Sequence, residues 1–164
     1  MDKKEIENMY LTFLKSEGFE CQILYEGVEF KDENVVYLLP KEEDNFFQIT
    51  CDITKLSSNA DIMDVMLLIN EMNFGYRSGK ISLVISDDET SKDVFVIADG
   101  GTYLSKKEDF KLFFKILLDE IKNIRNEFLI NCYQHNDRLE EKNKTEKTAY
   151  NRNDRRNRPV GKGN

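Results

Sequence analysis

Four short β-rich runs lie close together between residues 21 and 52, and their spacing constrains the fold more than any other feature of the chain. Linkers of two to six residues separate these runs, which are Cys21–Tyr25, Val28–Lys31, Val35–Leu39 and Phe46–Asp52. A parallel crossover needs about a dozen residues or more, so such short linkers favour antiparallel hairpins. The sequence therefore predicts an antiparallel meander in this part of the chain.

Three stretches with helical spacing accompany the strands. Apolar residues recur at every third or fourth position over 6–14, 57–73 and 110–129. This spacing places them on one face of an amphipathic helix. Gly18 is well placed to end the first helix, Ser57-Ser58-Asn59 supply possible caps for the second, and additional leucines widen the apolar surface of 57–73. We therefore expect the second helix to be the most buried one.

A second pair of strands precedes the last helix. Residues 80–86 and 93–98 alternate between apolar and polar, with a charged loop between them, and Asp99-Gly100-Gly101 has the composition of a turn. Ser105 and Glu108 have the spacing of a capping box, which predicts that the last helix starts there. The order α-β-β-β(-β)-α-β-β-α predicts an α+β fold, with an antiparallel sheet of five to six strands and flanking helices.

The net charge of -7 hides an asymmetry between the body of the chain and its end. Residues 141–164 contain eight Lys or Arg and three Asp or Glu, a net charge of +5, which leaves -12 for residues 1–140. Residues 140–164 are almost devoid of apolar groups, so burial cannot offset the entropy cost of ordering them. We therefore predict an α+β domain over 1–139 and a disordered basic tail over 140–164.

The composition also predicts a soluble protein in a reducing compartment, which we take to be the cytoplasm. No apolar run approaches the roughly 20 residues of a membrane span, and the first residues contain no apolar signal region. Cys21, Cys51 and Cys132 are odd in number and far apart, which disfavours disulfides or a zinc site and suits small buried side chains.

The order and spacing of these elements over roughly residues 3–135 resemble the YbjN-like family of the type III secretion chaperone-like fold. The segments that carry the resemblance are the helix ending at Gly18-Phe19, the hairpins up to 46–49, the helix 61–72 with the strand 80–85, and the closing helix 109–128. The resemblance implies a compact, often dimeric fold that binds or chaperones proteins, with no catalytic residues to transfer. The basic tail departs from the family pattern.

Four residue groups were considered as sites for chemistry, and none has the pattern that its chemistry requires. They are Cys132 with His135, Asp87-Asp88-Glu89 with Asp93, Glu42-Glu43-Asp44, and Asp99-Gly100-Gly101-Thr102. The first lacks an orienting acid, the second lacks the EF-hand glycine and glutamate, the third is a polar loop, and the fourth matches no phosphate-binding glycine motif. We therefore expect no catalytic, cofactor-binding or metal-binding residues, and no enzyme.

The candidate residues for partner binding lie late in the chain. Phe128, Ile130 and Tyr133 either complete the core or project as an apolar contact for a protein partner or a second copy. The tail offers four arginines suited to phosphates or acidic proteins: Arg152, Arg155, Arg156 and Arg158.

The leading hypothesis is a non-catalytic protein-binding module, chaperone-like or adaptor-like, that can form a homodimer. One alternative is an accessory protein that engages nucleic acid through the tail. The other is an acidic inhibitor or immunity protein for a basic partner.

Overall fold

The computed structural model describes residues 3–41, 46–58, 60–76, 78–86, 93–106 and 108–156 of the chain, with side chains through Tyr133. It divides into two compact units, Met1–Leu129 and Ile130–Asn164. The first unit contains the whole sheet and both shorter helices. The second contains the C-terminal part of the last helix.

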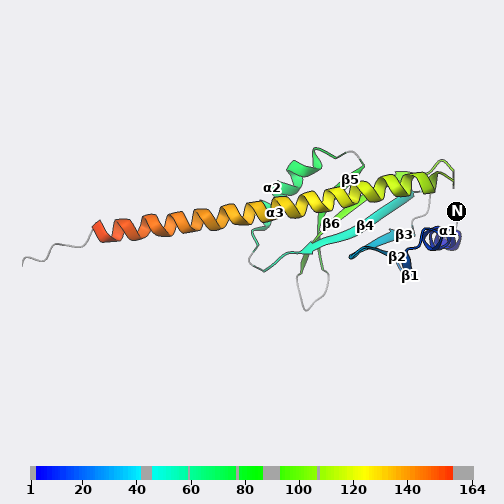
Figure 1. Cartoon of the computed structure of the whole chain (residues 1–164), viewed down its shortest axis with the longest axis horizontal. Coiled ribbons are helices and arrows are strands. Elements are labelled where there is room, and N and C mark those ends of the chain that lie inside the picture. Colours follow the sequence, from blue (N-terminus) through cyan, green and yellow to red (C-terminus); the bar gives the residue numbers. More distant parts are fainter. Residues whose placement is uncertain are drawn as a thin grey trace, which may run out of the picture. The chain divides into compact units, whose positions relative to one another are not determined.

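The sheet of the first unit has six antiparallel strands (Figure 1). The strands are β1 (Glu20–Ile23), β2 (Gly27–Asp32), β3 (Val35–Pro40), β4 (Phe46–Lys55), β5 (Gly79–Ile85) and β6 (Val94–Tyr103). Their spatial order is β1-β2-β3-β4-β6-β5, which makes β1 and β5 the two edges. The predicted α+β class and the antiparallel sheet are confirmed.

Within the described residues, three helices accompany the sheet: α1 (Lys3–Ser16), α2 (Ile62–Asn73) and α3 (Asp109–Arg156). α1 packs beside β1 and β2, and α2 packs beside β5. Gly18 follows α1 with a φ of 86°, the left-handed conformation expected of a residue that ends a helix. The cap of α2 is Asp61, whose carboxylate accepts hydrogen bonds from the backbone of Met63 and Asp64, so the predicted cap at 57–59 is wrong.

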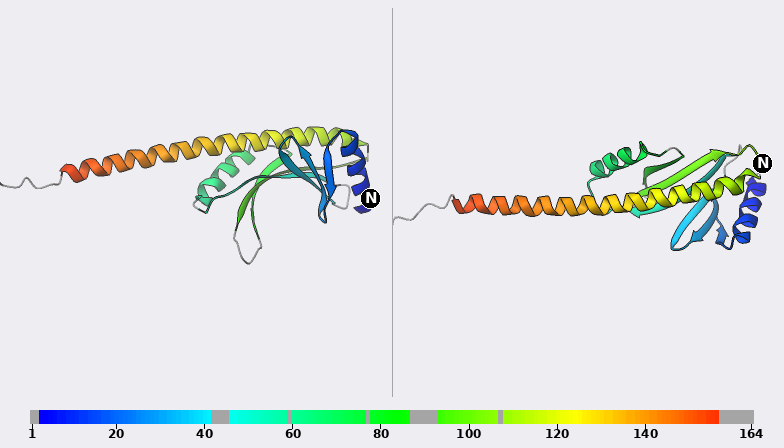
Figure 2. Two further views of the ribbon diagram at one scale, coloured as in Figure 1. Left: turned by 60° about the horizontal axis from the view of Figure 1, so that its bottom comes forward. Right: turned by 45° about the horizontal axis from the view of Figure 1, so that its top comes forward.

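The core lies between one face of the sheet and the first part of α3, which runs along that face (Figure 2). Strand register brings one row of side chains to this face, namely Cys21, Phe30, Tyr37, Cys51, Ala98 and Ile81. Phe114 of α3 contacts the rings of Phe13, Phe19, Phe30 and Phe47. Burial of such large rings supplies most of the hydrophobic stabilisation of a small core.

Two glycines in β6 allow α3 and a neighbouring ring to approach the sheet closely. A Cβ at Gly100 would lie 3.1 Å from Cδ1 of Ile121, and a Cβ at Gly101 would lie 2.5 Å from Cζ of Phe46. The turn predicted at Asp99-Gly100-Gly101 is therefore wrong, because β6 continues to Tyr103 and pairs with β4 over this stretch. In a strand, glycine often marks such a close approach.

The prediction that the second helix is the most buried is also wrong. Only Ile69 and Met72 of α2 are buried, whereas α3 buries seven apolar residues in the first unit. α2 lies beside an edge strand and packs on one side only, so the wide apolar surface that suggested burial faces solvent instead.

α3 begins at Asp109, just after the predicted capping box, and remains helical through Arg156. The sequence pattern predicted disorder from residue 140. The division into a domain and a basic tail stays a prediction, and Arg158 lies outside the described residues.

Candidate protein-docking surface

The solvent-facing side of α2 is apolar. Met63 and Leu67 have 65% and 63% of their surface exposed, and Ile62 and Met66 are nearly half exposed. On a helix, residues 62, 63, 66 and 67 fall on adjoining positions of one side, so their side chains form a continuous patch. Large apolar side chains gathered in this way mark sites of interaction more often than scattered ones do.

The edge strand β5 lies directly beside this patch and carries no charge from Ile81 to Ile85. The N–H of Ser86 donates to the carbonyl of Asp93 at 2.8 Å, which places the even-numbered residues of β5 in the ladder with β6. In an antiparallel ladder the alternate residues point their N–H and C=O groups the other way. The odd-numbered residues of β5 therefore face away from the sheet.

Side chains satisfy the first part of this outer edge. Oε1 of Glu120 accepts hydrogen bonds from the N–H groups of Ser78 and Gly79, at 3.2 and 3.1 Å. The amide of Asn73 then bonds both backbone groups of Ile81. Within the described part of the chain, no hydrogen bond reaches the outward N–H and C=O groups of Leu83 and Ile85.

α2 runs alongside the remaining open edge. Asn73, at the end of α2, bonds Ile81, whereas Ile62, at its start, lines a cavity of about 540 Å³ together with Val94, the register partner of Ile85. Met66 and Ile62 precede Asn73 by seven and eleven residues, so they lie on the same side of the helix as Asn73. The outer edge of β5 is therefore flanked by apolar side chains of α2.

The charged groups of α2 and its cap are all acidic, while Lys55, paired with Asp93, lines the cavity next to Ile62. The acidic groups are the capping Asp61, Asp64 in the first turn and Glu71, and the last turn contains no basic residue. Asp61 and Asp64 lie at the same end of α2 as Ile62, which places negative charge where β5 ends.

The residues predicted for partner binding differ from one another in burial and in the unit to which they belong. Phe128 is completely buried in the core of the first unit, so the idea that it projects into solvent is wrong. Ile130 and Tyr133 belong to the second unit and are 56% and 70% exposed, three positions apart on α3. Arg152, Arg155 and Arg156 lie in the C-terminal part of α3. Whether any of these residues binds a partner stays a prediction.

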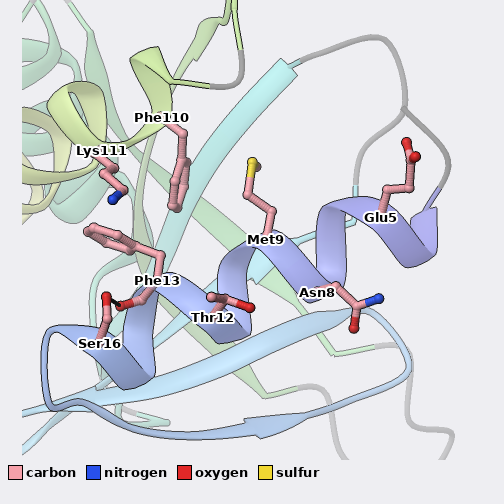
Figure 3. Close-up of a pocket in the computed structure, with 8 residues that line it drawn as sticks. All are labelled: Glu5, Asn8, Met9, Thr12, Phe13, Ser16, Phe110 and Lys111. Carbon is pink, nitrogen blue, oxygen red and sulfur yellow. Dashed lines mark hydrogen bonds between the residues drawn. The ribbon is translucent and has the colours of Figure 1, made fainter.

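A second surface depression lies between α1 and the start of α3 (Figure 3). Its volume is about 490 Å³, with Phe13 and Phe110 at its base and the polar side chains of Asn8, Thr12 and Ser16 along α1. The two rings are already buried and pack edge to face at 5.0 Å. The lining of the depression combines these polar groups with an apolar part from Met9 and the two rings.

Two titratable groups of the core, Cys51 and Tyr37, have raised pKa values. Burial raises the pKa of the Cys51 thiol to about 11, and the nearby charge of Arg125 lowers it in part. Burial likewise raises the pKa of the Tyr37 hydroxyl. Arg125 also lines a cavity of about 310 Å³ beside both groups, and its Nε is buried without a hydrogen-bond partner. These groups lack the paired nucleophile and base of a catalytic site.

Three of the four residue groups considered for chemistry lie at least in part within the described residues. Asp99 lies in β6, where burial raises the pKa of its carboxyl and Lys80, with Nζ at 3.8 Å, lowers it. Asp93 pairs with Lys55 at 2.5 Å. Residues 87–89 and 42–44, and the side chain of His135, lie outside the described residues. Among the residues that are described, no three His, Cys, Asp or Glu side chains gather as metal ligands.

The three cysteines are free thiols, and only Cys51 is fully buried, whereas Cys21 and Cys132 are partly exposed. No helix in the described ranges is both long and apolar enough to cross a membrane.

Sequence reasoning missed the α2–β5 surface, although two signals for it were present. Residues 62–69 contain more apolar positions than one face of a helix needs. Ile81–Ile85 also lacks the charge, proline or bulge with which edge strands usually avoid pairing with other chains. What could not be known was that β5 forms an edge, because that depends on the non-sequential order β4-β6-β5.

Comparison with known proteins supports the fold. No protein-family model matches the chain, and no curated protein matches it in sequence. One similar solved structure is described as the crystal structure of "YbjN, a putative transcription regulator from E. coli". It covers 77% of this chain and 92% of its own, with a TM-score of 0.61 and 12% sequence identity. At this identity the likeness concerns the fold alone, so the secretion-chaperone label is not supported, and the conclusion is that this chain has a YbjN-like fold.

Proposed function

We propose that this protein is a non-catalytic protein-binding module of the adaptor or chaperone type, and that its partner docks on α2 beside the edge of β5. The observation that carries the proposal is the exposed apolar side of α2, with Met63 and Leu67 nearly two thirds exposed. A partner that covered these side chains would gain roughly 25 cal/mol per Å² of apolar surface removed from water.

The charge of the molecule favours a basic partner. Residues 1–140 carry a net charge of -12, and the charges on α2 are acidic. Complementary charge raises the rate of association and disfavours acidic competitors. An acidic inhibitor or immunity protein for a basic target would use the same surface, so it is a special case of the same proposal.

Site-specific crosslinking in the native cell tests this function. A photoreactive residue at Met63 is expected to capture a defined protein, and Leu67→Glu should abolish capture because it places a charge in the apolar contact. Leu112 on α3 is 62% exposed, so a crosslinker there and the variant Leu112→Glu serve as matched controls. Equal capture at both positions, or capture unaffected by Leu67→Glu, contradicts the proposal.

Self-association is tested separately by light scattering of the purified protein over a range of concentrations. A homodimer that uses α2 should dissociate in Leu67→Glu and persist in Leu112→Glu. A dimer that persists in both variants would use another surface, for example the exposed Ile130 and Tyr133.

A second candidate function is engagement of nucleic acid through the C-terminal part of α3. Residues 141–156 carry six Lys or Arg and three Asp or Glu, and the description of YbjN refers to transcription. Binding through phosphate contacts should weaken steeply with salt and vanish when residues 141–164 are deleted. Retained binding in the truncated protein rules out the tail as its cause.

A further inference from the structure

The open edge of β5 and the apolar side of α2 form two walls of one surface, and each wall has a separate chemistry. The edge presents the outward N–H and C=O groups of Leu83 and Ile85. The helix presents Ile62 and Met66 on the side that Asn73 turns toward the edge. An extended chain is the structure that pairs with such an edge and also places alternate side chains against an apolar wall.

Because the open edge of β5 and the apolar side of α2 adjoin, we infer that the partner segment is an extended strand that adds antiparallel to β5 as a seventh strand. This inference rests on the proposed function. Its apolar residues occupy alternate positions and face α2, and a basic residue precedes them. Every strand pair in the sheet is already antiparallel, and antiparallel pairing is slightly the more stable kind.

Asn73 and Glu120 set the limit of this pairing. Because they already bond Ile81 and Gly79, the added strand can pair only from Leu83 onward. The ladder is therefore short, and backbone bonds alone would bind weakly. Contact with α2 has to supply the remaining affinity and also the selectivity for apolar side chains.

The position of α2 argues against a second copy of this chain as the added strand. Paired strands lie about 4.8 Å apart, whereas packed helices need about 8–10 Å between axes. A second copy pairing through its own β5 about a two-fold axis would bring its α2 to the same face of the joint sheet, too close to the first. A single extended segment brings no helix with it.

The acidic groups at the start of α2 predict the charge of the residues that precede the added strand. Asp61 and Asp64 lie where β5 ends, near the ion pair of Lys55 with Asp93, so the carboxylates outnumber the ammonium group there. An antiparallel strand begins at that end. Lys or Arg immediately before the strand would therefore lie near these carboxylates. The hydrogen bonds that the carboxylate of Asp61 accepts from Met63 and Asp64 hold it at the N-terminus of α2.

Synthetic peptides test this inference with the full-length protein. The probe is acetyl-Lys-Lys-Thr-Val-Thr-Ile-Thr-Val-amide, titrated by calorimetry or fluorescence anisotropy. In an antiparallel pair, residues directly opposite each other place their side chains on the same face. The Val and Ile residues of the peptide lie opposite Leu83 and Ile85, so their side chains face α2 and their N–H groups bond β5. N-methylation of Val and Ile should lower affinity at least about tenfold. The control peptide is N-methylated at the three Thr residues and so has the same number of added methyl groups; its affinity should change little.

Two protein variants probe the edge itself. Leu83→Pro removes an outward N–H without removing a bond to β6, as proline on an edge strand can. Ile85→Lys adds a charge to a position that is 63% exposed and so should fold normally. Both should reduce peptide affinity at least about tenfold. Val36→Lys, at a 48% exposed position of the interior strand β3, is the matched control and should bind as the parent protein does.

The outcomes separate this inference from the proposed function. Equal binding of both N-methylated peptides, or full binding by Ile85→Lys, overturns strand addition but leaves a partner that docks on α2 alone. A dimer that Ile85→Lys dissociates, with no binding of any peptide, overturns it in favour of a second copy. Strand addition is supported if Ile85→Lys and Leu83→Pro lose binding of the parent peptide, and the parent protein loses binding only of the peptide methylated at Val and Ile.

Discussion

The side chain of Asn73 pairs with the backbone of Ile81 as a neighbouring strand would. Its Nδ2 donates to the carbonyl oxygen at 2.8 Å, and its Oδ1 accepts from the N–H at 2.7 Å. The last residue of α2 thereby fixes the helix to the edge of the sheet and closes the edge at one point. The position of the apolar side of α2, and hence of the candidate docking surface, depends on this contact.

Asn73→Ala should therefore destabilise the protein by about 1–3 kcal/mol, because it leaves a partly buried N–H and C=O of Ile81 without partners. Urea denaturation with matched m-values measures the change. Asn70→Ala is the control, since Asn70 is an exposed residue of the same helix and should change stability by less than about 0.5 kcal/mol. Equal effects of the two substitutions would mean that the paired bonds contribute little.

Gly27→Ala should be strongly destabilising. A Cβ at Gly27, which pairs with Pro40, would lie 2.1 Å from the carbonyl oxygen of Leu39, and backbone cannot move aside easily. We expect a loss of more than about 2 kcal/mol in unfolding free energy, toward the upper end for overpacked sites. Gly75→Ala is the matched substitution, because its nearest atom is 3.4 Å away and its effect should be small. Thermal denaturation of the two variants compares them directly.

Asp99 should make the protein less stable as the pH rises. Its carboxyl has a raised pKa because it is buried, so the folded state binds the proton more tightly than the unfolded state does. Stability from this group is therefore complete below the ordinary pKa of 3.8 and is lost as pH rises through the raised value.

Asp99→Asn removes that loss. The variant should gain stability relative to the parent at about pH 7 and lose this advantage near pH 3, as measured by urea denaturation at each pH. Asp52→Asn, at an exposed position of β4, controls for the change in net charge. An advantage of Asp99→Asn that does not depend on pH would contradict the assignment.

Cys51 should react slowly with thiol reagents in the folded protein. The thiolate is the reactive form, and a pKa of about 11 together with 3% exposure leaves little of it accessible near pH 8. We expect alkylation of Cys51 to be at least about tenfold slower than that of the partly exposed Cys21. Mass spectrometry of the alkylated peptides measures both rates. In denaturant the two rates should converge. Similar rates in the folded state would show that the sheet opens at Cys51.

Much of the fold could be predicted because neighbouring residues determine it. The short linkers between 21 and 52 allowed only hairpins, and the left-handed Gly18 ended α1 where the pattern predicted. The turn predicted at 99–101 was wrong because distant parts of the chain meet there. Gly100 resembles a turn residue locally, but its role is to admit Ile121 of α3.

The docking surface could not be predicted for a related reason. Apolar periodicity in α2 indicates that the helix has an apolar side, but not whether the chain itself covers that side. The covering depends on which strand becomes the edge, and here β5 is placed outside β6. For Phe128 both core burial and projection were open, and its side chain is completely buried.

Residue-resolved hydrogen–deuterium exchange of the free protein tests the open edge of β5 most directly. The account predicts slow exchange for Ser82 and Val84, which bond β6, and for Ile81, which bonds Asn73, but fast exchange for Leu83 and Ile85. The basic apolar peptide should then slow exchange at Leu83 and Ile85 only. Leu83 and Ile85 amides that exchange as slowly as that of Val84 in dilute, unliganded protein would show that the edge is already occupied, and would contradict the account.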